Sequence, residues 1–163
     1  MQIVIVSDHS EQVATLQALA VEVGIEHAQG FTHPAAALDW CAENVPDLVL
    51  VDYMMRACDG LEFIRRYRAM SHLRNVPVVL MLPAVTGLAG VRAAAWKLGA
   101  TDFLGTPVDP TEFITRVRNL LVLRAAGLLQ LQAAGPDTML LDTQWREAPT
   151  APPALTYASG SRH

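Results

Sequence analysis

Short apolar runs alternate with longer stretches of helical spacing along most of the chain. The apolar runs lie between polar or turn-forming residues, which is typical of strands buried on both faces of a sheet. The clearest run is Leu48–Val51, which leads directly into Asp52. The pattern predicts strands at residues 3–6, 25–31, 48–51, 76–82 and 101–105.

The stretches between these runs carry apolar residues at spacings of three and four, which predicts helices with one apolar face. Ser10 is the expected N-cap of the first helix and Gly24 its stop signal. Pro34 suits the first turn of the second helix. Asp109-Pro110-Thr111-Glu112 has the pattern of a capping box. We expect helices at 10–24, from 34 until shortly before Pro46, at 59–70, at 87–98 and from 110 onward.

Strands that alternate with helices imply right-handed βαβ units and a parallel sheet with helices on both faces. At this chain length the usual arrangement is the flavodoxin-like (βα)5 fold, a doubly wound sheet with strand order 2-1-3-4-5. We therefore expect one such domain over residues 1–125.

Residues 126–163 differ from the rest of the chain, because they are rich in proline, glycine and serine after about residue 133. We expect a helix extension followed by a tail, with Met139-Leu140-Leu141 and Trp145 either docked or free. Leucines in the last helix and its extension exceed what one domain needs to cover its sheet. They predict burial against a second copy or a downstream domain, or against the chain's own tail. These leucines are Leu120, Leu121, Leu123, Leu128, Leu129 and Leu131.

Composition narrows the functional classes. The 163 residues are 52% hydrophobic and carry a net charge of −4, with no block of Lys or Arg. This argues against direct nucleic-acid binding. No apolar run approaches the length of a membrane span, and the first strand begins at the N-terminus without a signal-peptide pattern. Cys41 and Cys58 lack a metal or redox spacing, so we expect reduced thiols in a cytoplasmic protein.

Two aspartates follow predicted strands. Asp8 comes after the first strand and Asp52 ends the third, and parallel strands bring such ends together at one edge of the sheet. Neighbouring carboxylates repel unless a cation lies between them, and oxygen ligands suit Mg²⁺. A carboxylate held in this way can accept a phosphoryl group. Asp8 could instead serve only as a helix cap, and Asp52 only as a strand-end residue.

Around these aspartates the sequence resembles the receiver domain of two-component response regulators over about residues 1–125. The resemblance rests on Ser7-Asp8, Asp52, Asp59-Gly60-Leu61-Glu62-Phe63, Pro77–Met81, Gly99–Leu104 and Pro107. The residues around Asp52 and the Leu-Asp-Trp-Cys stretch also resemble receivers attached to cyclic-di-GMP phosphodiesterase domains. No His-Asp or Gly-Tyr-Pro motif of such an output domain follows here.

The resemblance implies that Asp52 is the phosphoacceptor, that Asp8, Asp52 and the backbone carbonyl of Met54 hold Mg²⁺, and that Phe103 stands at an aromatic switch position. It also implies a cis peptide bond between Thr106 and Pro107. Expected partners are a histidine kinase or another signalling protein, and a second copy bound through the last helix.

Several positions depart from the family pattern. Ser7 replaces one of two adjacent acids, Pro83 replaces a hydroxyl residue, and Thr106 replaces a lysine. Arg56 stands where the family often has proline; it is either solvated or lies over Asp52 and substitutes for the metal charge. Each loss removes a stabiliser of a highly charged transition state. We therefore expect a degenerate receiver with a weak Mg²⁺ site, impaired or absent phosphorylation at Asp52 and a fixed Phe103 ring.

Two alternatives remain. The first is a working phosphoacceptor that is phosphorylated on Asp52 with Mg²⁺. The second is an enzyme, but a dehalogenase-type phosphatase would need an acid at Met54, and a flavin binder would need a glycine-rich loop around Ser7 and Ser10. We therefore expect a binding module and not an enzyme.

Overall fold

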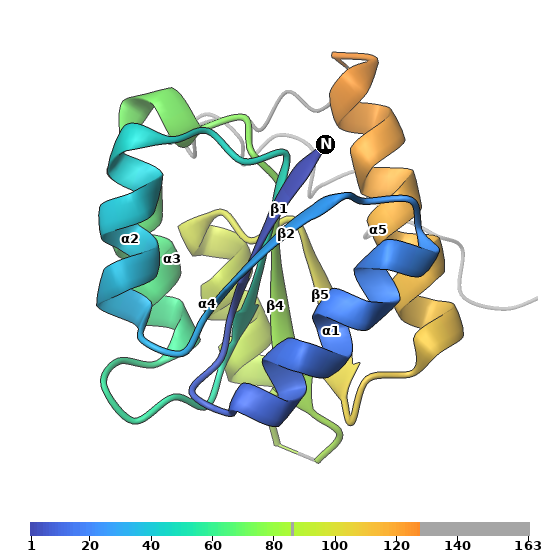
Figure 1. Cartoon of the computed structure of the whole chain (residues 1–163). Coiled ribbons are helices and arrows are strands. Elements are labelled where there is room, and N and C mark those ends of the chain that lie inside the picture. Colours follow the sequence, from blue (N-terminus) through green and yellow to red (C-terminus); the bar gives the residue numbers. More distant parts are fainter. Residues whose placement is uncertain (86, 128–163) are drawn as a thin grey trace, which may run out of the picture.

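The computed structural model describes residues 1–85 and 87–127, which form a five-stranded parallel sheet between two layers of helices (Figure 1). The strand order is β2-β1-β3-β4-β5, and each neighbouring pair is parallel. The flavodoxin-like fold and the strand order predicted from the sequence are confirmed. The strands are β1 (Gln2–Val6), β2 (His27–Phe31), β3 (Leu48–Asp52), β4 (Val78–Pro83) and β5 (Asp102–Thr106).

The helices divide between the two faces of the sheet. One face is covered by α1 and α5, and the other by α2, α3 and α4 (Figure 1). A short 3₁₀ turn, η1, lies between α3 and β4 and was not predicted. The bounds are α1 (Ser10–Glu22), α2 (Pro34–Glu43), α3 (Gly60–Arg68), η1 (Ser71–Leu73), α4 (Ala89–Leu98) and α5 (Pro110–Ala125).

The central strands are the most deeply buried part of the molecule. Every residue of β3 is buried, because helices cover both of its faces. Alternate residues of β3 point to opposite sides, so Leu48 and Leu50 pack with α1 and α5, while Val49 and Val51 pack with α2 and α3. Asp52 therefore ends a strand that the apolar core holds in place from both sides.

Helix caps agree with the sequence in most places. Asp59 and Asp109 precede α3 and α5, and each carboxylate accepts a 2.8 Å hydrogen bond from the backbone N–H three residues later. The prediction that Ser10 caps α1 was wrong: Ser10 is the first helical residue and His9 occupies the cap position, without a side-chain bond. The Thr106–Pro107 peptide bond is cis, as predicted.

The last helix is anchored at its C-terminal end. Arg124 donates from Nη1 to the carbonyl of Asn75 at 2.9 Å and from Nη2 to that of Pro46 at 3.3 Å. Two leucines that the sequence suggested for a partner surface, Leu120 and Leu121, pack instead in the domain's own core. Leu123 lies on the surface of α5. The leucines at 128, 129 and 131 and the tail residues named above lie outside the described residues.

Val122 and Leu123 are exposed on α5.

Among residues 1–85 and 87–127, no helix combines the length and the apolar character that crossing a bilayer requires.

Candidate functional site

The carboxyl ends of four strands place the predicted site residues at one edge of the sheet. Ser7 directly follows β1, and Asp52, Pro83 and Thr106 are the last residues of β3, β4 and β5. Strand register explains their proximity: Val6 pairs with Val51, Asp52 with Met81, and Pro83 with Thr106. The predicted positions therefore gather along this edge.

Asp52 lies deep in this edge, with 5% of its surface exposed. The hydroxyl of Ser7, which is fully buried, donates to Asp52 Oδ2 at 3.1 Å. The backbone N–H of Met54 donates to Asp52 Oδ1 at 3.1 Å. Both carboxylate oxygens thus have a hydrogen-bond donor from the protein. From the sequence, Ser7 was interpreted only as the replacement of an acid. In the structure its hydroxyl is a hydrogen-bond donor to the Asp52 carboxylate.

Gln12, which sequence reasoning missed, is a second neighbour of Ser7. Its amide oxygen lies 3.1 Å from Ser7 Oγ, and the backbone N–H of His9 donates to the same hydroxyl at 3.2 Å. A hydroxyl carries one proton, and the ionised Asp52 is its stronger acceptor. If the Gln12 amide is turned so that Nε2 faces Ser7, Nε2 donates to the Ser7 hydroxyl and leaves the hydroxyl proton for Asp52. The hydrogen-bond network sets this orientation of the amide.

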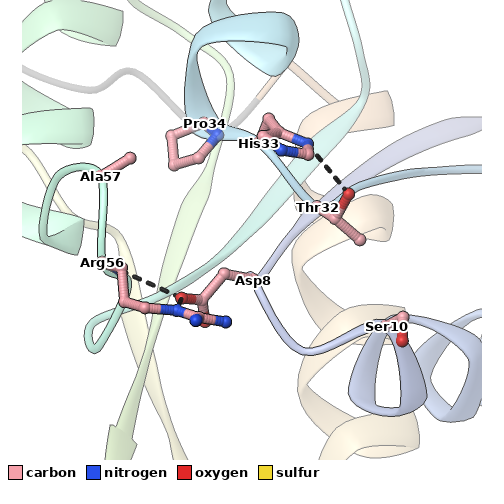
Figure 2. A pocket seen from close by; sticks show the side chains of 7 residues that line it. All are labelled: Asp8, Ser10, Thr32, His33, Pro34, Arg56 and Ala57. Carbon is pink, nitrogen blue, oxygen red and sulfur yellow. Dashed lines mark hydrogen bonds and ion pairs between the residues drawn. The ribbon is translucent and has the colours of Figure 1, made fainter.

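Asp8 interacts with Arg56 across two loops (Figure 2). Asp8 Oδ2 accepts hydrogen bonds from the Arg56 backbone N–H at 3.0 Å and from Arg56 Nε at 3.1 Å. Arg56 therefore pairs with Asp8, while its side chain stays 90% exposed to solvent. That Arg56 substitutes for the metal charge stays a prediction. His9 Nδ1 is 3.0 Å from Asp8 Oδ1, yet this buried oxygen accepts no hydrogen bond within the described residues.

The two carboxylates are shifted in opposite directions. Burial raises the pKa of Asp52 above its ordinary value, and the charge of Asp8 adds to this. The hydrogen bonds from Met54 and Ser7 act in the other direction without cancelling the rise. Desolvation also acts to raise the pKa of Asp8, but the hydrogen bonds from Arg56 and the charges of His9 and Arg56 together lower it. Asp8 is thus the more firmly ionised of the pair.

Phe103 is buried on β5 beneath α4. The edge of Trp96 packs against its ring, with 5.0 Å between centroids, and the Arg92 guanidinium lies 4.9 Å from the ring centroid. Both neighbours come from α4, so this helix covers the aromatic position that the sequence singled out.

Asp8 and Asp52 fit Mg²⁺ in the type of their donor atoms, and Asp8 Oδ1 is a buried oxygen that accepts no hydrogen bond from residues 1–85 or 87–127. No cluster of three or more His, Cys, Asp or Glu side chains able to share a metal occurs in the part of the chain that the structure describes. A pocket of about 490 Å³ opens beside Asp8 and gives access to it from solvent. Its lining is shown in Figure 2: Asp8, Ser10, Thr32, His33, Pro34, Arg56 and Ala57.

Residues 3–118 match the response regulator receiver domain. Together with the fold and the placement of Asp52, this match shows that the chain belongs to the receiver domain family of two-component signalling. The expectation of a receiver domain, which the sequence resemblance raised, is confirmed.

Among curated proteins, the chain is 38% identical over 125 residues to the cyclic di-GMP phosphodiesterase response regulator RpfG of Xanthomonas campestris pv. campestris (strain 8004). This alignment covers 76% of the chain and 32% of RpfG. The response regulator PleD of Caulobacter vibrioides is 34% identical over 136 residues, which cover 82% of the chain and 29% of PleD. The chain therefore spans about a third of the length of these two relatives.

Solved structures support the fold. The chemotaxis protein CheY4 of Vibrio cholerae superposes with a TM-score of 0.67 at 18% identity, covering 73% of this chain and 97% of CheY4. The beryllofluoride-activated NtrC4 receiver domain dimer also gives a TM-score of 0.67, at 21% identity, and covers 76% of this chain and 98% of that one.

Proposed function

We propose that this receiver domain acts mainly through protein–protein contacts and that phosphorylation of Asp52 is impaired or absent. The observation that carries the proposal is the state of the Asp52 carboxylate, which is 5% exposed and bonded at Oδ2 by Ser7 and at Oδ1 by Met54. Each bond occupies one lone pair of the oxygen that accepts it and draws negative charge from that oxygen, which makes the carboxylate a weaker nucleophile.

The other groups at the sheet edge offer little in return. Phosphoryl transfer depends on fixed charges and donors around the transferred group. Pro83 has neither a hydroxyl nor a backbone N–H, and Thr106 cannot supply the positive charge of a lysine. Losing one such charge-stabilising group typically lowers a rate by about a hundredfold to a thousandfold.

Mg²⁺ binding is proposed to be weak. Asp8, Asp52 and the backbone carbonyl of Met54 would hold the ion, which would supply positive charge beside the acceptor oxygen. Serine at position 7 leaves the site with one carboxylate fewer than the family pattern has. Arg56 already bonds Asp8.

Partners follow from the family and from the exposed surface. A histidine kinase or another signalling protein would bind the receiver, and α5, which exposes Val122 and Leu123, would contribute to pairing with a second copy. We propose that residues 1–125 form the receiver, that 126–163 extend from it, and that the chain works in the cytoplasm as a binding module and not as an enzyme. RpfG carries a phosphodiesterase name; any such activity linked to this chain would require residues beyond the receiver.

A working phosphoacceptor is the second candidate. It is favoured by Asp8 Oδ1, a buried oxygen that accepts no hydrogen bond from the described part of the chain, and by the position of Asp52 at the end of β3. Intact mass after incubation with acetyl phosphate and Mg²⁺ separates the two. The degenerate receiver gains no phosphoryl group, whereas a working one gains a single group that Asp52→Asn abolishes.

A further inference from the structure

We propose that Arg56 is a built-in counter-ion of Asp8 and thereby controls how tightly the receiver binds Mg²⁺. The inference rests on the proposed function, because it explains why the metal site is weak. It concerns an arginine of this chain at a position where the family often has proline.

Arg56 bonds Asp8 with two different groups. Its backbone N–H and its side-chain Nε both donate to the same oxygen, Asp8 Oδ2, at 3.0 and 3.1 Å. Nε is part of the charged guanidinium, so this bond also brings positive charge to the carboxylate. A metal ion that used Oδ2 would have to displace both donors.

Arg56 also stands on the approach to Asp8. The arginine side chain is 90% exposed, whereas that of Asp8 is 13% exposed, so the ion pair lies where the site meets solvent. Both residues line the pocket of about 490 Å³. Figure 2 shows the arginine reaching from the loop before α3 to the loop after β1. A cation that enters through this pocket approaches Asp8 beside the positive charge of Arg56.

The size of the competition follows from exposure. Ion pairs at the surface change an equilibrium constant by about fivefold or less, because water screens them. Loss of the guanidinium should therefore strengthen Mg²⁺ binding by up to about fivefold, with the backbone N–H still bonded to Oδ2. Proline at this position removes both donors, since it has no N–H, and should strengthen binding further.

The test is a Mg²⁺ titration of the full chain, followed by the amide NMR shifts of residues near Asp8 and Asp52. Wild type is compared with Arg56→Ala and Arg56→Pro at the same pH and ionic strength. We expect the affinity for Mg²⁺ to be highest in Arg56→Pro, intermediate in Arg56→Ala and lowest in wild type. Circular dichroism checks that each variant folds, and Arg56→Ala carries the test if the proline variant does not.

Two controls make the result specific. Arg65→Ala removes one positive charge from an arginine that pairs with Glu62 on α3, away from Asp8, and should leave the affinity at the wild-type value. Asp8→Asn combined with Arg56→Ala should lose the gain. Equal Mg²⁺ affinity in wild type and Arg56→Ala, or an equal gain in Arg65→Ala, overturns the proposal. Neither outcome depends on phosphoryl uptake, which tests the proposed function separately.

Discussion

Ser7 Oγ lies 3.1 Å from Asp52 Oδ2, and both side chains are buried between the neighbouring strands β1 and β3. A carboxylate at position 7 would repel Asp52 and call for a cation, whereas a hydroxyl donates to it. Serine in place of an acid at position 7 therefore replaces a repulsion between two carboxylates by a hydrogen bond to Asp52. Asp52 can then remain at the end of β3 without a bound metal.

Ser7→Ala should destabilise the fold by about 1–3 kcal/mol, because it leaves a buried carboxylate oxygen without its donor. Urea unfolding at neutral pH measures this free energy. Ser10→Ala is the matched control, since Ser10 is exposed in the first turn of α1. Equal stability of wild type and Ser7→Ala would show that the hydroxyl does not support Asp52.

Asp52→Asn should make the domain more stable at neutral pH. Burial raises the pKa of Asp52 in the folded state, so the folded state binds its proton more tightly than the unfolded state does. The stability of wild type therefore falls, relative to the Asn variant, as pH rises from the unfolded pKa through the folded one. Unfolding of both proteins at mildly acidic and mildly alkaline pH checks the sign. A difference that grows toward acid pH would contradict it.

Arg124→Ala should loosen the last turn of α5 and cost about 1–3 kcal/mol, because it removes charged donors from the carbonyls of Asn75 and Pro46. Hydrogen exchange should rise at the end of α5 and in the loops that hold these carbonyls. Arg118→Ala, at an exposed position of the same helix, should change neither exchange nor stability. Unchanged exchange in Arg124→Ala would mean that packing alone fixes the helix.

Val122→Asp should weaken self-association if α5 forms the proposed contact between copies. Val122 is 60% exposed, and Val85, at 61%, lies at the opposite end of the sheet and provides a matched Val85→Asp control. Sedimentation equilibrium of wild type and both variants should show an increase in the dissociation constant of about tenfold for Val122→Asp alone. If wild type is monomeric, or if both variants weaken association equally, α5 does not form the contact between copies.

The fold followed from the sequence because its signals are local and repeated. Apolar runs such as Leu48–Val51 leave few other solutions, and caps such as Asp109 act over three residues. Ser10 was misassigned as a cap because any hydroxyl before a helical pattern gives the same signal. The backbone, which the pattern does not specify, begins α1 at Ser10 itself.

The candidate site was predicted in position but not in its contacts. Strand ends placed Asp8 and Asp52 together, since register is set by the apolar pattern. The donor role of Ser7 was missed because the position was judged by the acid it lacks. The partner of Arg56 depends on the path of the loop after β3, which side-chain spacing does not encode.

The central claim is that the Asp52 carboxylate is a satisfied structural group and not an efficient acceptor. Intact mass of the full chain after incubation with acetyl phosphate and Mg²⁺ tests it most directly, beside Asp52→Asn and a variant that restores the family residues, Ser7→Asp with Pro83→Thr and Thr106→Lys. We predict no phosphoryl gain in wild type and a gain in the restored variant, with each protein checked for folding. Full, Mg²⁺-dependent labelling of wild type that disappears in Asp52→Asn would contradict the claim.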